Sequence, residues 1–459
     1  MKPKIMFINA IDIAKEIETA LPPLGLGYLA SSLRKEFGLD YIKFKIVDRD
    51  IEQEMNKFKP DIIGITSVSQ NYNRAIKYAR IAKKYDLPVI MGGVHISALP
   101  STLTNDMDAG VIGEGEETII DLFNLFEEKR YFDKNELEKI DGICFRRNGK
   151  LIVTKKRKPV EPLDKIPMPA RDLLTIKKCT YMFTSRGCYY RCTFCASSRF
   201  WDKFRFFSAE YVVNEIKYLI KKYDVEEIGF WDDLFTADKK RVKQILEMLK
   251  KEDILGNVSF SCNVRSNLVN DEIVQLLKQM NVKSVGMGLE SGSPITLEYL
   301  KGRNISIEDH INAVKILRKY GIKPHVSFII GSPKETQEDI LQTLRFIKEN
   351  RLDSFDVYVL TPFPGTPVWD YVKARNLVNE DMNWDTLNVN FGENYNDAII
   401  LSEKLTREEI YKLFLLFANE KKKIMIKRSL RNPLNLLKNP KSLLKTLTKI
   451  LSGKLLIER

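Results

Sequence analysis

The sequence is poor in histidine and cysteine and lacks any long apolar run. Its 459 residues contain three histidines and six cysteines. No apolar stretch approaches the ~18 residues that a membrane-spanning helix needs. The short apolar run Ile5–Asn9 is strand-like and does not resemble a signal segment. We therefore expect a cytoplasmic protein with reduced thiols, and not a secreted domain held together by disulfides.

The positive charge is confined to one end of the chain. The formal net charge is +13, and residues 421–459 hold twelve Lys or Arg and one acid. This segment accounts for +11, so the other 420 residues carry only +2. Because the excess is so localised, the sequence gives no support to a nucleic-acid-binding function for the whole protein.

Three of the six cysteines are closely spaced. Cys188, Cys192 and Cys195 form a Cys-x-x-x-Cys-x-x-Cys pattern, with Phe194 just before the last cysteine. A cubane iron–sulfur cluster usually takes four thiolates. Three thiolates leave one iron without a protein ligand, and an open iron can hold a substrate. The spacing therefore predicts a 4Fe-4S cluster with an open site.

Zinc is the rival interpretation of this trio. A zinc site wants four ligands, usually cysteine pairs or cysteines with histidines. All three histidines, His95, His310 and His325, lie more than ninety residues from the trio, and Cys179 lies nine residues upstream. The ligand count favours the cluster. The other cysteines, Cys144, Cys179 and Cys262, have no such spacing and are expected to be small buried residues.

Residues 1–135 alternate short apolar strands with helical patterns. This alternation predicts an α/β fold with a doubly wound parallel sheet. Ligands of such sheets bind at the carboxyl ends of the strands, and small or polar residues gather there in this chain. The expected strands are Ile5–Asn9, Phe44–Val47, Ile62–Thr66, Val89–Gly92 and Gly110–Gly113, with helices at Tyr72–Lys84 and Glu116–Glu127.

Residues 136–178 are predicted to form a hairpin around Asn148-Gly149 followed by a proline-dotted linker. Residues 179–375 alternate again, and six strand–helix units predict a partial (β/α)6 barrel of the TIM type, with active residues at the strand ends. Its expected strands are Tyr181–Ser185, Glu227–Trp231, Val258–Cys262, Ser284–Leu289, His325–Ile330 and Asp356–Leu360. Trp231 and Phe235 are expected in the core, and His310 on the surface of a helix.

Residues 376–459 form a C-terminal extension. Thr406-Arg-Glu-Glu409 is a capping-box pattern that predicts a helix start. Further on, Leu443, Leu444, Leu447, Ile450 and Leu451 share one helical face, punctuated by lysines. This pattern suits the surface of an anionic bilayer. A helix packed on the barrel and a solvated end remain alternatives.

The cysteine motif resembles that of the radical S-adenosylmethionine (radical SAM) enzymes, and the first segment resembles the cobalamin-binding domain found before many of their barrels. The second resemblance depends on an ordered set of motifs at the start of the first helix and at three strand ends. These are Pro22-Pro-Leu-Gly-Leu-Gly-Tyr28, Thr66–Ser69, Gly92-Gly-Val-His95 and Gly113-Glu-Gly-Glu116. A histidine that ligates cobalt in the best-known cobalamin domains has no counterpart in Val47–Gln53.

The resemblance implies three cofactors and a set of contacts. The cysteine trio would hold the cluster, whose open iron would chelate SAM. The implied cobalamin contacts are Leu24, Gly25, Thr66, Ser67, Ser69, Gly92, Gly93, His95, Gly113, Glu114 and Gly115. A hydrogen-bonded structural role is an equal alternative for His95. The implied SAM contacts are Phe194, Asp232, Asp233, Arg265, Glu290, Ser291, Ser327 and Gly331.

Individual roles also follow from the resemblance. Glu290 would hold ribose hydroxyls, the Asp232–Asp233 pair would face the methionine ammonium, and Arg265 would pair with the carboxylate. The family often has Gly-Gly-Glu where this chain has Trp231-Asp-Asp233. The role of either aspartate is therefore open.

The expected activity is methylation of an unactivated carbon. One SAM would methylate cob(I)alamin, and a second would yield a 5′-deoxyadenosyl radical that abstracts a substrate hydrogen. Radical cyclisation, oxidation or rearrangement without methyl transfer is an alternative. So is a non-catalytic redox component that binds SAM and the cluster. Expected partners are a small-molecule or lipid-like substrate and an electron donor such as ferredoxin or flavodoxin, with the basic tail at the inner face of the membrane.

Overall fold

The computed structural model describes residues 2–12 and 21–431, with the side chains of 429–431 left out. The chain divides into two compact units. The first contains Met1–Tyr190, Cys195–Phe260 and Phe363–Asp385, and the second contains Arg191–Phe194, Ser261–Pro362 and Thr386–Arg459. The amphipathic pattern at residues 443–451 lies outside the described part of the chain.

The first unit is built on a seven-stranded sheet with the order β2-β1-β3-β4-β5-β6-β7. The first five strands in this order pair in parallel, and β6 and β7 add to the edge antiparallel. Ile5 is opposite Phe44 on one side and Ile62 on the other. The strands are β1 Lys4–Asn9, β2 Lys43–Val47, β3 Ile62–Thr66, β4 Val89–Gly92, β5 Ala109–Val111, β6 Ile143–Arg147 and β7 Lys150–Val153.

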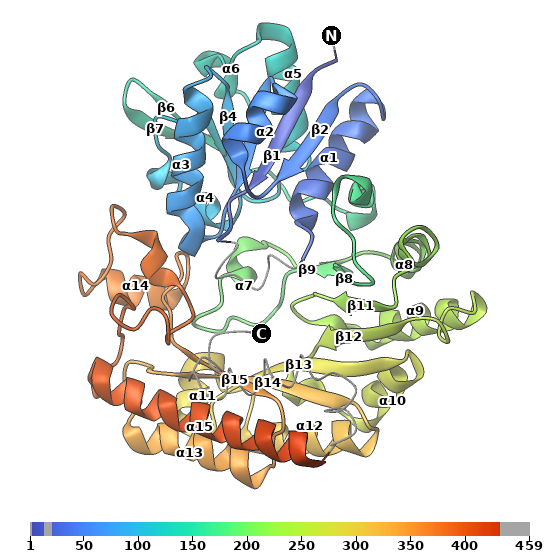
Figure 1. The fold of residues 1–459 in the computed structure, drawn as a ribbon, viewed down its shortest axis with the longest axis vertical. Helices are drawn as coiled ribbons and strands as arrows, with labels where there is room; N and C mark the ends of the chain where they lie inside the picture. Colours follow the sequence, from blue (N-terminus) through green and yellow to red (C-terminus); the bar gives the residue numbers. More distant parts are fainter. Residues whose placement is uncertain (1, 13–20, 432–459) are drawn as a thin grey trace. The chain divides into compact units, whose positions relative to one another are not determined.

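Helices cover both faces of this sheet (Figure 1). On one face α1 and α5 contact each other, and on the other α2 contacts α3. Phe7, Leu33, Leu122 and Phe123 belong to the core under α1 and α5, which removes their apolar surface from water. The helices are α1 Leu24–Phe37, α2 Ile51–Phe58, α3 Tyr72–Lys83, α4 Val94–Ala98 and α5 Thr118–Lys129.

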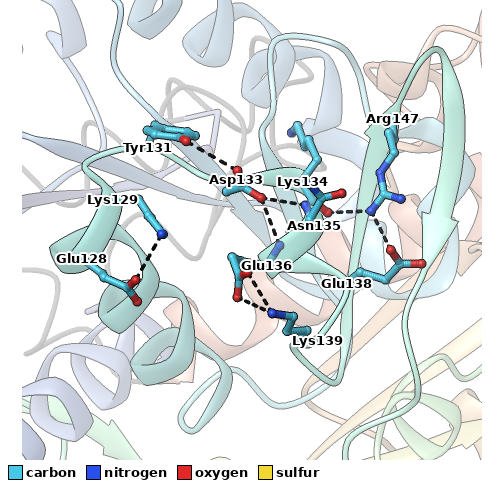
Figure 2. A network of polar contacts seen from close by, with 10 residues as sticks. All are labelled: Glu128, Lys129, Tyr131, Asp133, Lys134, Asn135, Glu136, Glu138, Lys139 and Arg147. Carbon is cyan, nitrogen blue, oxygen red and sulfur yellow. Dashed lines mark hydrogen bonds and ion pairs between the residues drawn. The ribbon is translucent and has the colours of Figure 1, made fainter.

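A short polar turn joins α5 to the antiparallel edge of the sheet. Asp133 caps α6 (Lys134–Leu137) by accepting hydrogen bonds from the backbone N–H of Asn135 and Glu136. Figure 2 shows this cap beside Arg147 of β6, which donates to Glu138 at 2.7 Å. The hairpin predicted from Asn148-Gly149 is confirmed as β6–β7, and it extends the first sheet.

The remainder of the first unit begins the second sheet. β8 (Cys179–Met182) pairs in parallel with β11 (Glu227–Phe230), and α8 packs on α9. A small antiparallel pair, β9 with β10, follows β8. The other elements here are β9 Ser185–Arg186, β10 Arg205–Phe206, α7 Ser197–Phe200, α8 Ala209–Tyr223, α9 Lys239–Lys251 and α14 Pro367–Lys373.

The second unit holds the later strands of the second sheet, whose order is β15-β14-β13-β12-β11-β8. β14 pairs in parallel with both β13 and β15, and the division between units falls inside β12. The strands are β12 Ser259–Asn263, β13 Val282–Glu290, β14 Lys323–Ile330 and β15 Phe355–Val359. The helices are α10 Asp271–Gln279, α11 Pro294–Lys301, α12 Ile307–Lys319, α13 Gln337–Glu349 and α15 Arg407–Arg431.

The predicted helix start at Thr406 is confirmed. The Thr406 backbone N–H donates to the Glu409 carboxylate at 2.7 Å, and the Glu409 N–H donates back to the Thr406 hydroxyl at 3.3 Å. This helix, α15, continues to Arg431, so it includes the first part of the basic segment. Lys421 donates to Asp356 at 2.6 Å, which fixes that part to the start of β15.

Three expectations about single residues are wrong. His310 is fully buried, not on the surface, and accepts or donates a hydrogen bond at 2.7 Å with Ser266. Cys179 is exposed, whereas Cys144 and Cys262 are buried as expected. Trp231 is 43% exposed because it follows β11 at a strand end and does not point into the core.

Candidate active site

A cavity of about 400 Å³ lies in the first unit at the carboxyl ends of its parallel strands. We call it the first cavity. One wall comes from strand ends and helix starts, including Gly25, Thr66, Gly92, Gly93, Gly113, Glu114, Gly115 and Glu116. The opposite wall comes from the residues around the cysteine motif and the end of β11. These are Phe183, Ser185, Arg186, Gly187, Ser197, Phe200, Trp201, Trp231 and Asp233.

Glycines make the strand-end wall of the first cavity flat. A Cβ at Gly25 or Gly113 would meet nothing within 4 Å, and one at Gly92 would meet only Ile65 O at 3.9 Å. The space over these positions therefore belongs to the cavity. Gly93 differs, because its φ is +98° and a Cβ would lie 2.6 Å from Ser67 O. Only glycine fits this turn without strain.

Buried charges line the same cavity in matched pairs. Arg186 lies 3.4 Å from Glu114 and also pairs with Glu116, and Arg205 donates to Glu114 at 3.2 Å. Burial alone would raise the pKa of Glu114, but the two guanidiniums and the Val160 N–H lower it below its usual value. The cavity therefore keeps the Glu114 carboxylate ionised beside an apolar floor.

Aromatic rings hold Arg186 in place. Its guanidinium carbon lies 5.3 Å from the Tyr28 ring centre and 5.1 Å from the Trp201 ring centre. Contacts at this distance are cation–π interactions. Burial raises the pKa of Tyr28, so its hydroxyl stays protonated. Arg186 was not predicted as a site residue from the sequence, although it lies between Ser185 and Gly187, directly before the first cysteine of the motif.

The two adjacent aspartates after β11 have different surroundings. Asp232 is fully buried and accepts from the backbone N–H of Thr184 at 2.6 Å and of Ser185 at 3.1 Å. It also lies 3.6 Å from Arg241. Burial raises the pKa of Asp232. Asp233 lines the first cavity and accepts from Ser197 at 2.6 Å. Asp233 is thus placed to contact a ligand in the first cavity. Asp232 instead stabilises the backbone at Thr184 and Ser185, just before the cysteine motif.

His95 does not line the first cavity, and neither do Leu24, Ser67 and Ser69. The imidazole is fully buried, with Nδ1 3.1 Å from Ser69 Oγ and Nε2 3.1 Å from Thr102 Oγ1. The Tyr72 ring stacks on it at 3.8 Å. Burial lowers the pKa of His95 to about 3. This is the arrangement of a hydrogen-bonded structural histidine, the alternative left open by the sequence.

The second unit contains a separate polar cluster around Cys192. Arg265 Nη1 lies 3.5 Å from the Cys192 sulfur, and Arg265 Nη2 donates to Lys301 O at 3.3 Å. Lys301 Nζ in turn lies 3.4 Å from the Glu290 carboxylate. Arg265 therefore links the Cys192 sulfur to the backbone of α11. Lys301 was not predicted as a site residue from the sequence, because nothing in its spacing from Glu290 indicates that the two side chains meet.

Glu290 has an unusual backbone conformation at the end of β13. Its φ is +66°, and the pairing of β13 with β14 is irregular between Gly288 and Glu290. A Cβ at Gly288 would lie 2.1 Å from the Glu290 carboxylate, so the glycine makes room for that side chain. Burial raises the pKa of Glu290, while Lys301 opposes the rise. Left-handed backbone at a non-glycine residue is a frequent property of functional positions.

The other expected SAM contacts vary in their surroundings. Ser291 is buried and accepts from the Ser293 N–H at 3.1 Å. Gly331 has a φ of +84° and donates its N–H to Glu335 at 2.6 Å. Ser327 and Phe194 are partly buried. These contacts stay predictions, because the geometry shows how each residue is held and not what it binds.

Known families and relatives match most of this chain. Residues 182–347 match the model of the radical SAM superfamily, and residues 11–123 match the model of the B12 binding domain. An uncharacterized methyltransferase, PH0819 of Pyrococcus horikoshii, is 35% identical over 87% of this chain and 88% of the relative. The chain belongs to the radical SAM superfamily and carries a B12-binding domain. It is a cobalamin-dependent radical SAM enzyme.

More distant relatives share the architecture. The anaerobic magnesium-protoporphyrin IX monomethyl ester cyclase of Rubrivivax gelatinosus is 27% identical over 79% of this chain and 68% of the relative. The structure of the methyltransferase TsrM from Kitasatospora setae superposes with a TM-score of 0.69 at 17% identity. It covers 82% of this chain and 75% of TsrM. This superposition confirms the predicted α/β class, with a Rossmann-like domain and a barrel-like domain.

The cofactors of this radical SAM enzyme are a 4Fe-4S cluster, SAM and cobalamin. The donor set fits the cluster, since three cysteines leave one iron for SAM. Cys188 and Cys195 belong to the first unit and Cys192 to the second. Within residues 2–12 and 21–431, no three Cys, His, Asp or Glu side chains are gathered as a metal site. None of the six cysteines, all of them described, forms a disulfide. The trio's role as cluster ligand stays a prediction.

The first cavity fits a large flat cofactor on its own geometry. Its floor has open glycine positions that a side chain would fill, and its apolar lining includes Phe7, Leu26 and Ile119. Of the expected cobalamin contacts, Gly25, Thr66, Gly92, Gly93, Gly113, Glu114 and Gly115 line it. No helix in the described part of the chain is long and apolar enough to span a membrane.

Proposed function

We propose that this enzyme methylates an unactivated carbon of a small-molecule or lipid-like substrate. One observation carries the proposal. The first cavity is bounded by the glycine-rich strand ends of the B12-binding domain and also by Ser185, Arg186 and Gly187, which directly precede Cys188. One cavity therefore adjoins both the expected cobalamin contacts and the residues before the cysteine motif. When bound, the cluster and SAM supply a 5′-deoxyadenosyl radical and cobalamin supplies a methyl group.

The chain's own residues provide binding and the exclusion of water. Arg265 contacts the Cys192 sulfur, and Glu290, held by Lys301, offers a carboxylate to ribose hydroxyls. Asp233 offers an acceptor to an ammonium group. Phe200, Trp201 and Trp231 give the first cavity apolar walls, which protect a carbon radical from solvent.

A second candidate function is radical cyclisation without methyl transfer. Its support is the cyclase of Rubrivivax gelatinosus, which shares 27% identity with this chain. The same cofactors and the same cavity serve both reactions. A non-catalytic role as a redox component is a third candidate, from a different class.

Product analysis separates these candidates. Anaerobically reconstituted protein is incubated with SAM, cobalamin and a strong reductant, and 5′-deoxyadenosine and S-adenosylhomocysteine are measured. Both products together support methyl transfer. 5′-Deoxyadenosine alone supports cyclisation, and the absence of both supports the binding role.

A pair of cysteine variants controls that experiment. Cys192→Ala is expected to remove the cluster absorbance and both products, while cobalamin binding remains. Cys179→Ala changes an exposed cysteine outside the motif and is expected to leave the cluster, iron content and products unchanged. Equal iron content in both variants would argue against Cys192 as a cluster ligand.

We also propose a cytoplasmic, anaerobic setting in which ferredoxin or flavodoxin reduces the cluster, and a bilayer contact through residues 432–459. The support for the bilayer contact is the basic, leucine-patterned sequence. Because α15 includes residues 421–431 and Lys421 pairs with Asp356, truncation should begin at residue 432. Flotation with anionic liposomes is expected to be lost on truncation, and unchanged flotation would argue against the contact.

A further inference from the structure

A second cavity of about 480 Å³ lies in the first unit. It is formed by the loop after β3, helix α4, the linker before the cysteine motif, helix α7 and the segment after β15. Its lining includes Ser69, Val94, Ala98, Lys156, Arg157, Lys158, Arg199, Asp202, Arg205, Phe363 and Pro364. Nothing in the proposed methyl transfer has used this space.

The two cavities differ in charge. The second has five cationic side chains, Lys156, Arg157, Lys158, Arg199 and Arg205, and two acids, Glu114 and Asp202. The first has one cation, Arg186, and three acids, Glu114, Glu116 and Asp233. The second cavity is therefore positive, while the first has an acidic excess. A positive concave surface concentrates anions.

The cations of the second cavity differ in how far they are already neutralised. Lys156 pairs with Asp202, Arg157 lies 3.7 Å from Glu117 and also pairs with Asp121, and Arg205 pairs with Glu114. Lys158 has no carboxylate partner among the described residues, and it is exposed. Arg199 donates to Cys195 O at 2.7 Å and to Ser198 Oγ at 3.3 Å, so it is already engaged within its own segment.

The second cavity adjoins the first. Gly113, Glu114, Phe200 and Trp201 line both. A molecule held in the second cavity by a charged end therefore lies close to the first cavity. The apolar side chains Val94, Ala98 and Phe363 of the second cavity suit the apolar part of such a molecule.

We propose that the second cavity binds an oxyanion, a carboxylate or phosphate of the substrate, through Lys158. This inference rests on the proposed function, because it places the reacting carbon of the anchored substrate in the first cavity. Arginine and lysine are the usual partners of such groups. The same chemistry is present in the phosphodiester of cobalamin, so the test must separate the two sources.

Inorganic phosphate serves as the probe. It is titrated by calorimetry, at constant ionic strength, into the full chain carrying its cluster and cobalamin. Lys158→Glu is expected to raise the Kd for phosphate about fivefold or more, because the substitution reverses a charge at the site. Lys155→Glu is the matched control. Lys155 is the neighbouring lysine, its side chain is 82% exposed, and it does not line the cavity.

A second titration identifies the source of the oxyanion. Cobalamin, and cobinamide, which lacks the phosphodiester tail, are each titrated into the cluster-bearing chain and its Lys158→Glu variant. Cobalamin affinity within twofold of the wild type supports a substrate site. Weaker cobalamin binding with unchanged cobinamide binding would assign the oxyanion to the cofactor and overturn the proposal.

Two further results would also overturn it. One is a phosphate Kd that does not change in Lys158→Glu. The other is an equal change in Lys155→Glu, which would indicate a general surface potential. Neither titration measures turnover, so failure here is distinct from failure to form 5′-deoxyadenosine and S-adenosylhomocysteine.

Discussion

The first and second cavities share a wall at Glu114 and Trp201, but they are built from different kinds of sequence. Strand ends rich in glycine form the floor of the first cavity, and its buried charges are paired with one another. Lys156, Arg157 and Lys158 of the basic linker contribute to the second, where at least Lys158 faces solvent. A flat, internally neutralised surface suits a large cofactor, whereas an incompletely neutralised one suits a charged ligand.

Filling the first cavity should have the largest effect. A Cβ at Gly92 meets only Ile65 O at 3.9 Å, so the side chain of Gly92→Leu would grow into the cavity. We expect cobalamin binding to fall at least ~100-fold, because the new side chain occupies the ligand's space, while phosphate binding in the second cavity stays unchanged. Equilibrium dialysis with cobalamin measures this loss.

Gly256→Leu is the control for that experiment. A Cβ there has no neighbour within 4 Å, and the residue lines neither cavity. Its cobalamin affinity should equal that of the wild type. If Gly92→Leu bound cobalamin normally while folded, the first cavity would not be the cofactor site.

Removing Arg186, one member of a buried ion pair in the first cavity, should destabilise the folded protein. Arg186→Gln leaves the buried Glu116 carboxylate without its guanidinium, and breaking a buried pair in this way costs about 3–5 kcal/mol. The free energy of unfolding from urea titration measures the cost. Lys158→Glu in the second cavity should change this free energy little, since Lys158 has no partner to lose.

Arg303→Gln is the matched control for Arg186→Gln. Arg303 pairs with Glu298 at 2.6 Å, but its side chain is 88% exposed, and exposed pairs contribute about 0–1 kcal/mol. Similar losses for the two variants would show that the charges around the first cavity are solvated and not buried.

The sequence predicts the strand ends that border these cavities better than the side-chain contacts around them. Strand ends such as Thr66 and Gly92 follow from local periodicity and glycine content, and the structure places them as expected. Arg186 meets Glu116 across a separation of 70 residues, and Asp232 meets Thr184 across 48. Contacts of this kind depend on the folded chain, and no local sequence pattern predicts them.

Local sequence patterns also did not predict the buried position of His310 or the positive φ of Glu290. His310 lies in an amphipathic helix, where its place on the buried face depends on Ser266 from another element. The positive φ of Glu290 depends on the irregular pairing of β13 with β14. Trp231 follows an apolar strand and looks like core, but the strand ends at Phe230, so the ring faces the first cavity.

Acid should affect His95, beside the second cavity, before it affects Glu114, which lines both cavities. His95 braces Ser69, which lines the second cavity, and its pKa of about 3 lies below the ordinary 6.5. The unfolded chain therefore takes up a proton that the folded chain refuses, and stability is lost as pH falls from 6.5 toward 3. At pH 5 the loss is about 2 kcal/mol relative to pH 7.

The stabilising contribution of Glu114 is lost in a lower pH range than that of His95. Its folded pKa is below its ordinary value of 4.5, so its stabilising contribution is complete at pH 5 and is lost only in stronger acid. His310 contributes a similar acid sensitivity, because burial also lowers its pKa to about 3. His95→Gln therefore isolates the first contribution. The variant should show a smaller drop in urea stability between pH 7 and pH 5, and an identical drop would contradict a neutral buried His95.

Salt should have the smallest effect, and it should separate the two cavities most directly. Between 0.05 and 0.5 M sodium chloride the Debye length shortens from roughly 14 Å to about 4 Å. The exposed Lys158 is screened over this range, so phosphate affinity in the second cavity should fall several-fold. The charges of the first cavity are buried and paired, with Arg186 and Glu116 only 7% and 9% exposed. Cobalamin affinity should therefore change less than twofold. Parallel titrations at both salt concentrations measure how strongly the phosphate affinity and the cobalamin affinity depend on salt. An equal dependence would mean that the charges of the two cavities are equally accessible to solvent.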